Sequence, residues 1–336
     1  MRLPRSLAWL LLILTFFTAG LLRQSHDRIF NSPFLPSTVG SLLFAAVLLL
    51  LLVAARERRM GAVRGKGVRL GSLTPLLLML LLEKWVSLAL YNPAFNLLGN
   101  ADSPERLLDA QYRAFAGAGL LLVCLLLVTF SPPAARRTWR RASLRRFPIA
   151  AAATLLTVLM SYLILWGLAA ALGNPMKLIW PHADQLWFWT FGGQAVRAFA
   201  EEFYYRGLIL FEMQRLAPRL GVRSLAARRW TALLFSSFLF GMEHLFLAPT
   251  LQETGRRFIF SVCLGLLLGI IVLVSSNLHF AAGLHAGINW LLLGAAPYFV
   301  GESGESVLAP GSYIGLGLSV AFVLLFVAAS RRRSRH

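Results

Sequence analysis

Ten stretches of about 18 or more mostly apolar residues dominate this chain of 336 residues. Because about 20 helical residues, each rising about 1.5 Å, cross a hydrocarbon core about 30 Å thick, each stretch is long enough for a transmembrane helix. The eighth and ninth stretches are separated only by Ser275, Ser276 and Asn277. We therefore expect an all-α, polytopic transmembrane helix bundle of about ten spans. The expected spans are residues 6–22, 38–55, 71–91, 114–131, 147–172, 185–211, 230–247, 257–276, 278–296 and 312–330.

The composition supports a membrane protein and excludes a water-soluble globule. Hydrophobic residues make up 57% of the chain and charged residues 14%, with a mean hydropathy of +0.67. An average soluble domain has about 25% charged residues. Arg2 and Arg5 before the first apolar stretch resemble the start of a signal peptide, but no small-x-small cleavage site precedes Arg23, so we expect a retained helix. Cys124 and Cys263 lie inside apolar stretches and are expected to be buried, without a disulfide.

The net charge of +19 reports topology rather than a nucleic-acid partner. With the N-terminus in the cytoplasm, 23 Lys and Arg residues fall on the inner side of the bilayer and 7 on the outer side. This positive-inside bias places both chain ends in the cytoplasm. The basic clusters form short loops and a tail without a nucleic-acid motif, so anionic lipid headgroups are their expected counterions. We expect a multi-pass protein of a bacterial inner membrane.

Polar residues divide the chain into regions with different expected roles. Residues 1–146 contain spans with few polar side chains and predict an anchoring region of about four helices. Residues 147–330, where ionisable residues interrupt the spans from about residue 185 onward, predict the chemically active core. Residues 331–336 form a basic cytoplasmic tail. No internal repeat is visible.

The intramembrane polar residues cluster on three spans. Inserting an ionisable residue into hydrocarbon costs about 2.5–3.5 kcal/mol, so each one requires a function or a partner. Residues four apart share a face of a helix, which predicts shared faces within each span. Gly283 and Gly287, also four apart, predict a close helix approach. The paired residues are Arg197 with Glu201, Glu202 with Arg206, and His285 with Asn289, while His244 lies on the span between them.

This set of side chains fits the hydrolysis of an amide by water. A carboxylate with a histidine can hold and deprotonate a water molecule. A second histidine with an asparagine amide can donate hydrogen bonds to a developing oxyanion. No Gly-x-Ser-x-Gly motif is present, and Ser236 and Ser237 have no acid–base pattern around them.

At these positions the sequence resembles the CPBP family of CAAX-processing and bacteriocin-processing intramembrane endopeptidases, also called the Abi family and related to the CAAX prenyl protease. The resemblance covers roughly residues 185–296. Three motifs in successive order carry it: Glu-Glu-x-x-x-Arg at Glu201, Glu202 and Arg206, Phe-x-x-x-His at Phe240 and His244, and His-x-x-x-Asn at His285 and Asn289.

The resemblance implies a role for each motif residue. Glu201 with His244 would activate water, and His285 with Asn289 would form the oxyanion hole. Glu202 and Arg206 would order the carboxylate helix, and Phe240 would pack under His244. The family implies no catalytic metal and no cofactor. The alternative is a divalent metal such as zinc held by Glu201, His244 and His285, since glutamate and histidine are zinc ligands.

Several polar and aromatic residues have structural interpretations. Arg197 has no counterpart in the family pattern and is expected to be an i,i+4 partner of Glu201. Glu243 is interpreted equally as a supporting group or an interfacial acid, and His279 as an interfacial histidine. The remaining set, predicted to be aromatic anchors at the membrane interfaces, is Trp180, Trp187, Trp189 and Trp230.

We therefore predict an intramembrane endopeptidase that cleaves a membrane-associated peptide or protein. The expected partners are this substrate and the lipid bilayer, with no nucleic acid. CAAX cleavage and the maturation of other peptides are both open as substrate classes. The alternatives are a catalytically silent scaffold or immunity protein, and a proton-coupled transporter, which would favour inverted repeats and broken helices.

Overall fold

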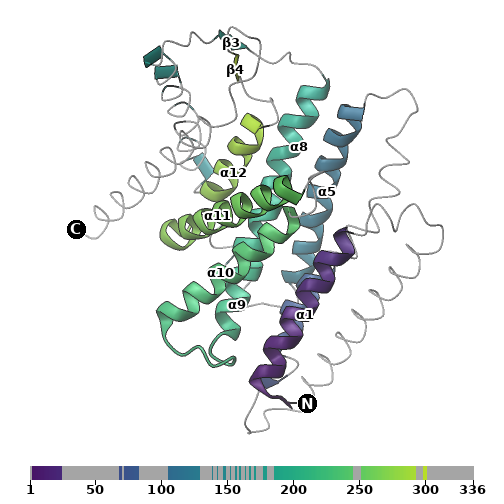
Figure 1. Cartoon of the computed structure of the whole chain (residues 1–336), viewed down its shortest axis with the longest axis vertical. Coiled ribbons are helices and arrows are strands. Elements are labelled where there is room, and N and C mark those ends of the chain that lie inside the picture. Colours follow the sequence, from purple (N-terminus) through teal and green to yellow (C-terminus); the bar gives the residue numbers. More distant parts are fainter. Residues whose placement is uncertain are drawn as a thin grey trace, which may run out of the picture. The chain divides into compact units, whose positions relative to one another are not determined.

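The computed structural model places most of the described chain in helices (Figure 1). The described residues are 2–24, 68–69, 72–82, 105–128, 185–244, 251–292 and 298–300, with scattered positions between 138 and 179. The expected spans at 38–55 and 312–330 lie outside the described residues, as does most of the span at 147–172.

The described helices follow the apolar stretches. In chain order they are α1 (Arg5–Gln24), the helix Ser72–Leu82, α5 (Glu105–Val128), α8 (Gln185–Glu202), η2 (Phe203–Ile209), α9 (Leu210–Leu216), α10 (Leu225–His244), α11 (Leu251–Ser275) and α12 (Leu278–Leu292). The element η2 is a π-helix, so the single expected span 185–211 is built from three consecutive helical segments. The described residues also include two antiparallel pairs of short strands, which are β1 (Arg2–Leu3) with β2 (Val68–Arg69) and β3 (Lys177–Ile179) with β4 (Tyr298–Val300).

The all-helical class is confirmed for the described residues apart from these strand pairs. One helical segment among them, Thr254–Ser275, is long and apolar enough to cross a membrane. Shorter apolar segments occur at Arg5–Thr15, Ser72–Leu82 and Ala114–Leu125. The ten spans and the orientation of the termini stay predictions.

The chain divides into two compact units. Unit 1 comprises Met1–Leu97, Gly119–Arg140 and Phe203–Gly269, and unit 2 comprises Leu98–Ala118, Arg141–Glu202 and Ile270–His336. The boundary between Glu202 and Phe203 coincides with the change from α8 to the π-helix η2.

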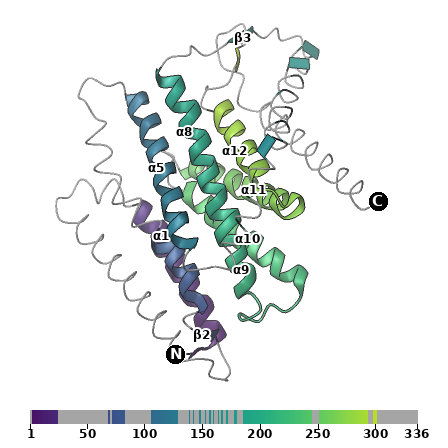
Figure 2. The same ribbon diagram turned by 180° about the vertical axis from the view of Figure 1, so that it is seen from behind.

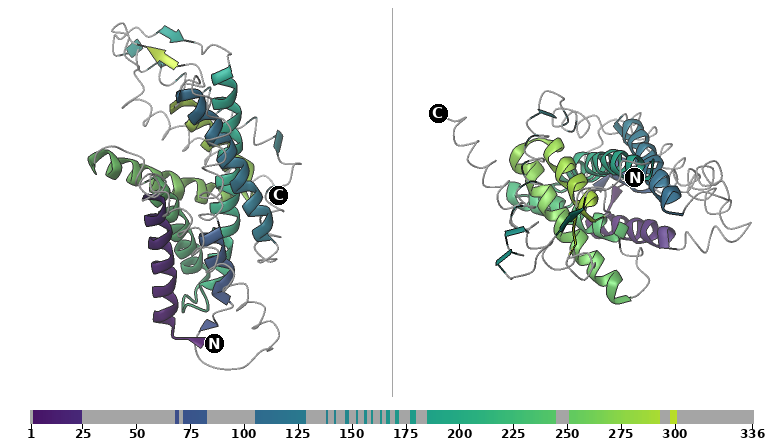
Figure 3. Two further views of the ribbon diagram at one scale, coloured as in Figure 1. Left: turned by 90° about the vertical axis from the view of Figure 1, so that its right-hand side faces the viewer. Right: turned by 90° about the horizontal axis from the view of Figure 1, so that it is seen from above.

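In unit 1, α10 packs against η2 and α9, and α1 packs against α10 (Figure 3). The inward face of α1 carries Ala8 and Leu12, four residues apart and both fully buried, whereas Leu10 and Leu14 are exposed. The helix Ser72–Leu82 is buried along almost its whole length, as expected for a helix that is apolar all round.

Polar contacts join the helix Ser72–Leu82 to the helices that follow in unit 1. The hydroxyl of Tyr204 donates to the backbone carbonyl of Met79 at 2.8 Å. Arg215 donates through Nη2 to the carbonyl of Ser72 at 2.9 Å and forms an ion pair with the fully buried Glu212. A carbonyl in an apolar interior needs such a donor, because an unsatisfied buried polar group costs about 1–3 kcal/mol.

Unit 2 is built on the packing of α12 against α8, which lie side by side (Figure 2). Their contacts pair rising residue numbers on α8 with falling numbers on α12, so the two helices are antiparallel. The predicted close approach fits this packing, since Gly287 is buried and Gly283 half-buried on α12.

The short break between the eighth and ninth expected spans is confirmed, and its side chains explain it. Helix α11 ends at Ser275, and Ser276 adopts a left-handed conformation with φ of 56°. The side-chain oxygen of Asn277 accepts from the backbone N–H of His279 at 3.0 Å, which caps the start of α12. The chain therefore turns within two residues without leaving these backbone groups unsatisfied.

The cysteine prediction is right for one residue and wrong for the other. Cys124 is fully buried, whereas Cys263 is exposed on α11, and neither is in a disulfide. An apolar stretch does not by itself tell which face of its helix meets protein, and Cys263 lies on a face that does not.

Gly117 on α5 allows the closest backbone approach in unit 2. A Cβ added there would lie 2.7 Å from Cα and 2.9 Å from N of Arg197, and a helix backbone cannot move away cheaply. We expect Gly117→Ala to destabilise the fold by about 1–3 kcal/mol, the usual cost of overpacking. Gly192→Ala is the matched control, because a Cβ there meets nothing within 4 Å and alanine is the better helix former. Thermal unfolding in detergent compares the two, and equal melting temperatures would contradict the predicted contact.

Candidate functional site

Polar side chains of α8 and α12 meet inside unit 2. On α8 they follow a helical spacing of three, four and one residues at Gln194, Arg197, Glu201 and Glu202. Gln194, Glu201 and Glu202 are each at most 7% exposed, although the rest of this helix is mostly apolar. Such burial is costly for ionisable groups and is tolerated where partners compensate.

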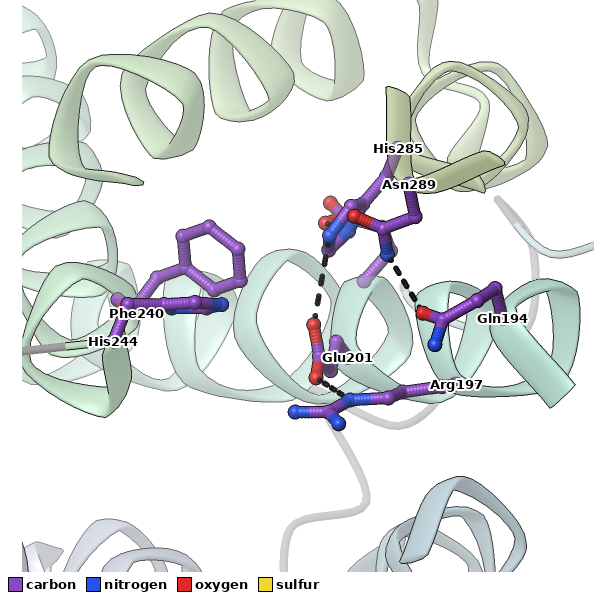
Figure 4. Close-up of polar contacts among 8 residues, drawn as sticks. Gln194, Arg197, Glu201, Phe240, His244, His285 and Asn289 are labelled. Carbon is purple, nitrogen blue, oxygen red and sulfur yellow. Dashed lines mark hydrogen bonds and ion pairs between the residues drawn. The ribbon is translucent and has the colours of Figure 1, made fainter. Parts of the chain in front are cut away.

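Arg197 is the first partner of Glu201. Its Nε donates to Oε1 of Glu201 at 2.7 Å, one helical turn along α8 (Figure 4). The predicted i,i+4 pairing is therefore confirmed. Arg197 binds Oε1 of Glu201, whereas Oε2 faces α12.

His285 of α12 lies between the two adjacent carboxylates. Its Nδ1 is 2.9 Å from Oε1 of Glu202, and its Nε2 is 3.6 Å from Oε2 of Glu201. An ionised carboxylate only accepts hydrogen bonds, so Nδ1 carries the proton in the bond to Glu202. Because adjacent helical residues point about 100° apart, two neighbouring glutamates can reach different nitrogens of one ring.

Asn289, one turn further along α12, pairs with a residue absent from the predicted set. Its Nδ2 donates to Oε1 of Gln194 at 3.2 Å (Figure 4). The only sequence signal for Gln194 is its position seven residues before Glu201, on the same face of α8. The partner helix and its register decide this contact, so the spacing alone does not predict it.

Aromatic rings close the end of this antiparallel pair beyond Gln194 and Asn289. The rings of Trp290 and Phe191 stack at 4.2 Å, and Nε1 of Trp290 donates to the carbonyl of Phe191 at 2.9 Å. The ring of Trp187 also stacks on the ring of Phe191, with the two ring centres 5.1 Å apart. The interfacial role predicted for Trp187, Trp189 and Trp230 stays a prediction, and Trp180 lies outside the described residues.

His279 at the start of α12 is packed inside unit 2. It is 6% exposed, its Nε2 donates to the carbonyl of Ala142 at 3.0 Å, and its ring stacks on Phe199 at 5.7 Å. These contacts give His279 a structural role in unit 2, and its place at a membrane interface stays a prediction.

The second group of predicted site residues belongs to unit 1. The guanidinium of Arg206 lies 4.3 Å from the centre of the Phe240 ring, and the ring of His244 lies 4.6 Å from that same ring. Nδ1 of His244 is 2.9 Å from the carbonyl of Phe240. A carbonyl only accepts, so Nδ1 carries the proton and Nε2 is the basic nitrogen of a neutral His244 ring.

Arg206 is fully buried and lies in the π-helix η2. Hydrogen bonds of a π-helix span five residues instead of four, so the helical period changes after Glu202. The pairing of Glu202 with Arg206 stays a prediction. The hydroxyl of Ser236 on α10 donates to the carbonyl of Tyr205 at 2.7 Å, which supports the π-helix from a neighbouring helix. This contact gives Ser236 a structural role. Glu243, next to His244, is half-buried.

Phe240 is expected to stabilise unit 1 far more than another phenylalanine of the same helix. Phe240→Leu removes the contact with the Arg206 guanidinium, which is worth about 2 kcal/mol where both groups are desolvated. Phe238→Leu is the matched control, because Phe238 is 42% exposed and meets the Phe258 ring edge to face. Thermal unfolding of both variants in detergent should show the larger loss for Phe240→Leu. Equal losses would contradict a stabilising cation–π contact.

The described residues contain no group of three or more His, Cys, Asp or Glu side chains arranged to hold a metal ion. The described ligand-type residues of unit 2 are instead joined to each other and to Arg197, with His285 between Glu201 and Glu202. Whether catalysis needs a metal is tested by adding a zinc chelator to the cleavage assay.

Residues 183–291 match the family model described as Type II CAAX prenyl endopeptidase Rce1-like. The matched segment is 109 of the 336 residues and contains all three predicted motifs, from Glu201 to Asn289. This match confirms the family resemblance. Proteins of this family are integral membrane proteins with protease activity. No curated protein and no solved structure gives a significant match to the chain.

Proposed function

From the match of residues 183–291 to the family model of CAAX prenyl endopeptidases, we propose that this protein is an intramembrane endopeptidase that hydrolyses a peptide bond with a water molecule activated by Glu201. The observation that carries the proposal is the position of His285 on α12, whose ring contacts both Glu201 and Glu202 of α8 within the matched segment. A buried acid–base set of this kind is costly to the fold and typical of catalytic sites.

In the proposed reaction, Glu201 accepts a proton from water while the water oxygen attacks the carbonyl carbon of the scissile peptide bond. His244 assists through Nε2, a role that rests on the family pattern and on the tautomer fixed by the Phe240 carbonyl. Arg197 then shares or releases Oε1 of Glu201. When the tetrahedral intermediate collapses, the carbon–nitrogen bond breaks and the departing amine receives the proton from Glu201.

His285 and Asn289 stabilise the oxyanion in this proposal. Glu202 accepts from Nδ1 of His285 at 2.9 Å and so fixes the orientation of the imidazole ring. In the resting conformation Nε2 of this ring faces Oε2 of Glu201 at 3.6 Å, a length beyond that of a hydrogen bond. When both ring nitrogens carry a proton, Nε2 of His285 donates to the developing oxyanion, and Asn289 supplies a second donor through Nδ2.

The substrate is a membrane-associated protein or peptide. The family name indicates a prenylated C-terminus as one class. A peptide or protein with a C-terminal apolar segment is the other class, because the sequence contains no feature that requires a prenyl group.

The test is cleavage by the full chain reconstituted in liposomes. The probes are a farnesylated peptide ending in a CAAX sequence and an unprenylated peptide with a C-terminal apolar helix, with products identified by mass spectrometry. We expect the wild type to cleave at least one probe and the variants Glu201→Ala, His244→Ala and His285→Ala to cleave neither. Equal cleavage by all three variants and the wild type would overturn the proposal. Cleavage by none of the proteins would favour a silent scaffold, and loss of wild-type cleavage with a zinc chelator would favour the metal-dependent alternative.

A further inference from the structure

The buried amide pair between α8 and α12 has no place in the family motifs. Gln194 is 2% exposed, and its Oε1 accepts from Nδ2 of Asn289 at 3.2 Å. No described contact joins Gln194 to Glu201 or Glu202. Its one described hydrogen bond is with Asn289, so Gln194 can influence the site by orienting the Asn289 amide.

An asparagine side chain has two orientations of nearly the same shape, which exchange Oδ1 and Nδ2. Only one of them presents an N–H to an oxyanion, and the other presents an oxygen that repels it. A carbonyl oxygen only accepts, so Oε1 of Gln194 selects the orientation in which Nδ2 of Asn289 faces it. One N–H of Nδ2 is used in this bond, and the second N–H of the same nitrogen is left for the substrate.

The helix pairing around the amides holds both of them in register. Next to Asn289, Trp290 donates to the carbonyl of Phe191, one turn before Gln194, and stacks on its ring at 4.2 Å. On the other side, His285 is bonded to Glu202 at 2.9 Å. Contacts on both sides of the pair fix the separation of the two backbones, so the choice of orientation is left to Gln194.

We infer that Gln194 is a positioning residue, which holds the Asn289 amide with its N–H toward the oxyanion of the substrate. This inference rests on the proposed function. It predicts an effect on kcat rather than on KM, because the contact with the oxygen strengthens only as the oxyanion forms.

The experiment measures kcat and KM on whichever of the two membrane peptides the wild type cleaves. Gln194→Met keeps the length of the side chain but removes the acceptor, and we expect kcat to fall about fivefold to tenfold with KM within about twofold, as a net hydrogen bond of ordinary strength predicts. Gln194→Glu keeps an acceptor oxygen in either protonation state and is expected to retain most of the wild-type kcat. If the methionine variant is not recovered folded, Gln194→Ala removes the same acceptor without adding an atom.

Two further variants separate positioning from general packing. Gln214→Met makes the same chemical change on α9 of unit 1 and is expected to leave kcat unchanged. In an Asn289→Ala background, Gln194→Met should cause no further loss, because the group that it orients is already absent. A loss of kcat that simply adds to that of Asn289→Ala, or an unchanged kcat in Gln194→Met, would overturn the inference alone. A wild type that cleaves neither peptide would overturn the proposed function, and this inference with it.

Discussion

Replacing Glu201 by glutamine is expected to lower kcat for peptide cleavage by at least about 10³-fold while the protein keeps its melting temperature. A positioned general base contributes about 10²–10⁴-fold, and no other described carboxylate contacts both Arg197 and His285. Glutamine has the shape of glutamate, and its Oε1 can still accept from Nε of Arg197, so the helix pairing is preserved. Its amide has no lone pair basic enough to take a proton from water.

Glu201→Asp is the control for this prediction. Aspartate keeps the carboxylate but draws it back by one methylene, and small misplacements of a catalytic group cost up to about 10²-fold. We expect measurable cleavage by the aspartate variant and none above background by the glutamine variant, with turnover followed by mass spectrometry. Glutamine activity equal to that of the wild type would remove Glu201 from the chemistry and leave it a structural role beside Arg197.

The parts of the site that could be predicted from the sequence are those set within one α-helix. Residues four apart share a face, and this rule alone predicts that Arg197 meets Glu201. The boundary between α11 and α12 is also local, because a left-handed Ser276 and the capping side chain of Asn277 end one helix and begin the next.

The contacts that could not be predicted depend on a neighbouring helix or on a change of helix type. The pairing of Gln194 with Asn289 depends on the register of α8 against α12, and the spacing of residues within α8 does not determine that register. The π-helix η2 changes the helical period at Phe203, so the four-residue rule alone does not give the face on which Arg206 lies.

Burial is the other property that the sequence leaves open. His279 lies at the start of α12 and Cys263 lies inside the apolar α11, yet His279 is buried and hydrogen-bonded, whereas Cys263 is exposed. In water, a polar face marks the exposed side of a helix. A helix that crosses a bilayer lacks this polar face, so hydropathy does not distinguish the side that meets protein from the side that meets lipid.

His244 offers the second large effect, through two amide replacements that imitate different ring nitrogens. His244→Asn can still donate to the Phe240 carbonyl, as Nδ1 does at 2.9 Å, but has no group at the position of Nε2. His244→Gln places its amide near the position of Nε2. If His244 shares the proton of the attacking water, neither amide can replace it, and both variants should lose about 10²–10⁴-fold in kcat.

The comparison of the two variants distinguishes three roles for this histidine. Cleavage retained by His244→Gln but lost by His244→Asn would mean that Nε2 only holds the water through a hydrogen bond, because the oxygen of glutamine can accept but not take up a proton. Cleavage retained by His244→Asn would reduce the role of His244 to its bond with Phe240 and its place beside that ring, 4.6 Å away. Melting temperatures measured alongside separate these outcomes from unfolding, since Phe240 and Arg206 stay in place in both variants and the stack between them should preserve unit 1.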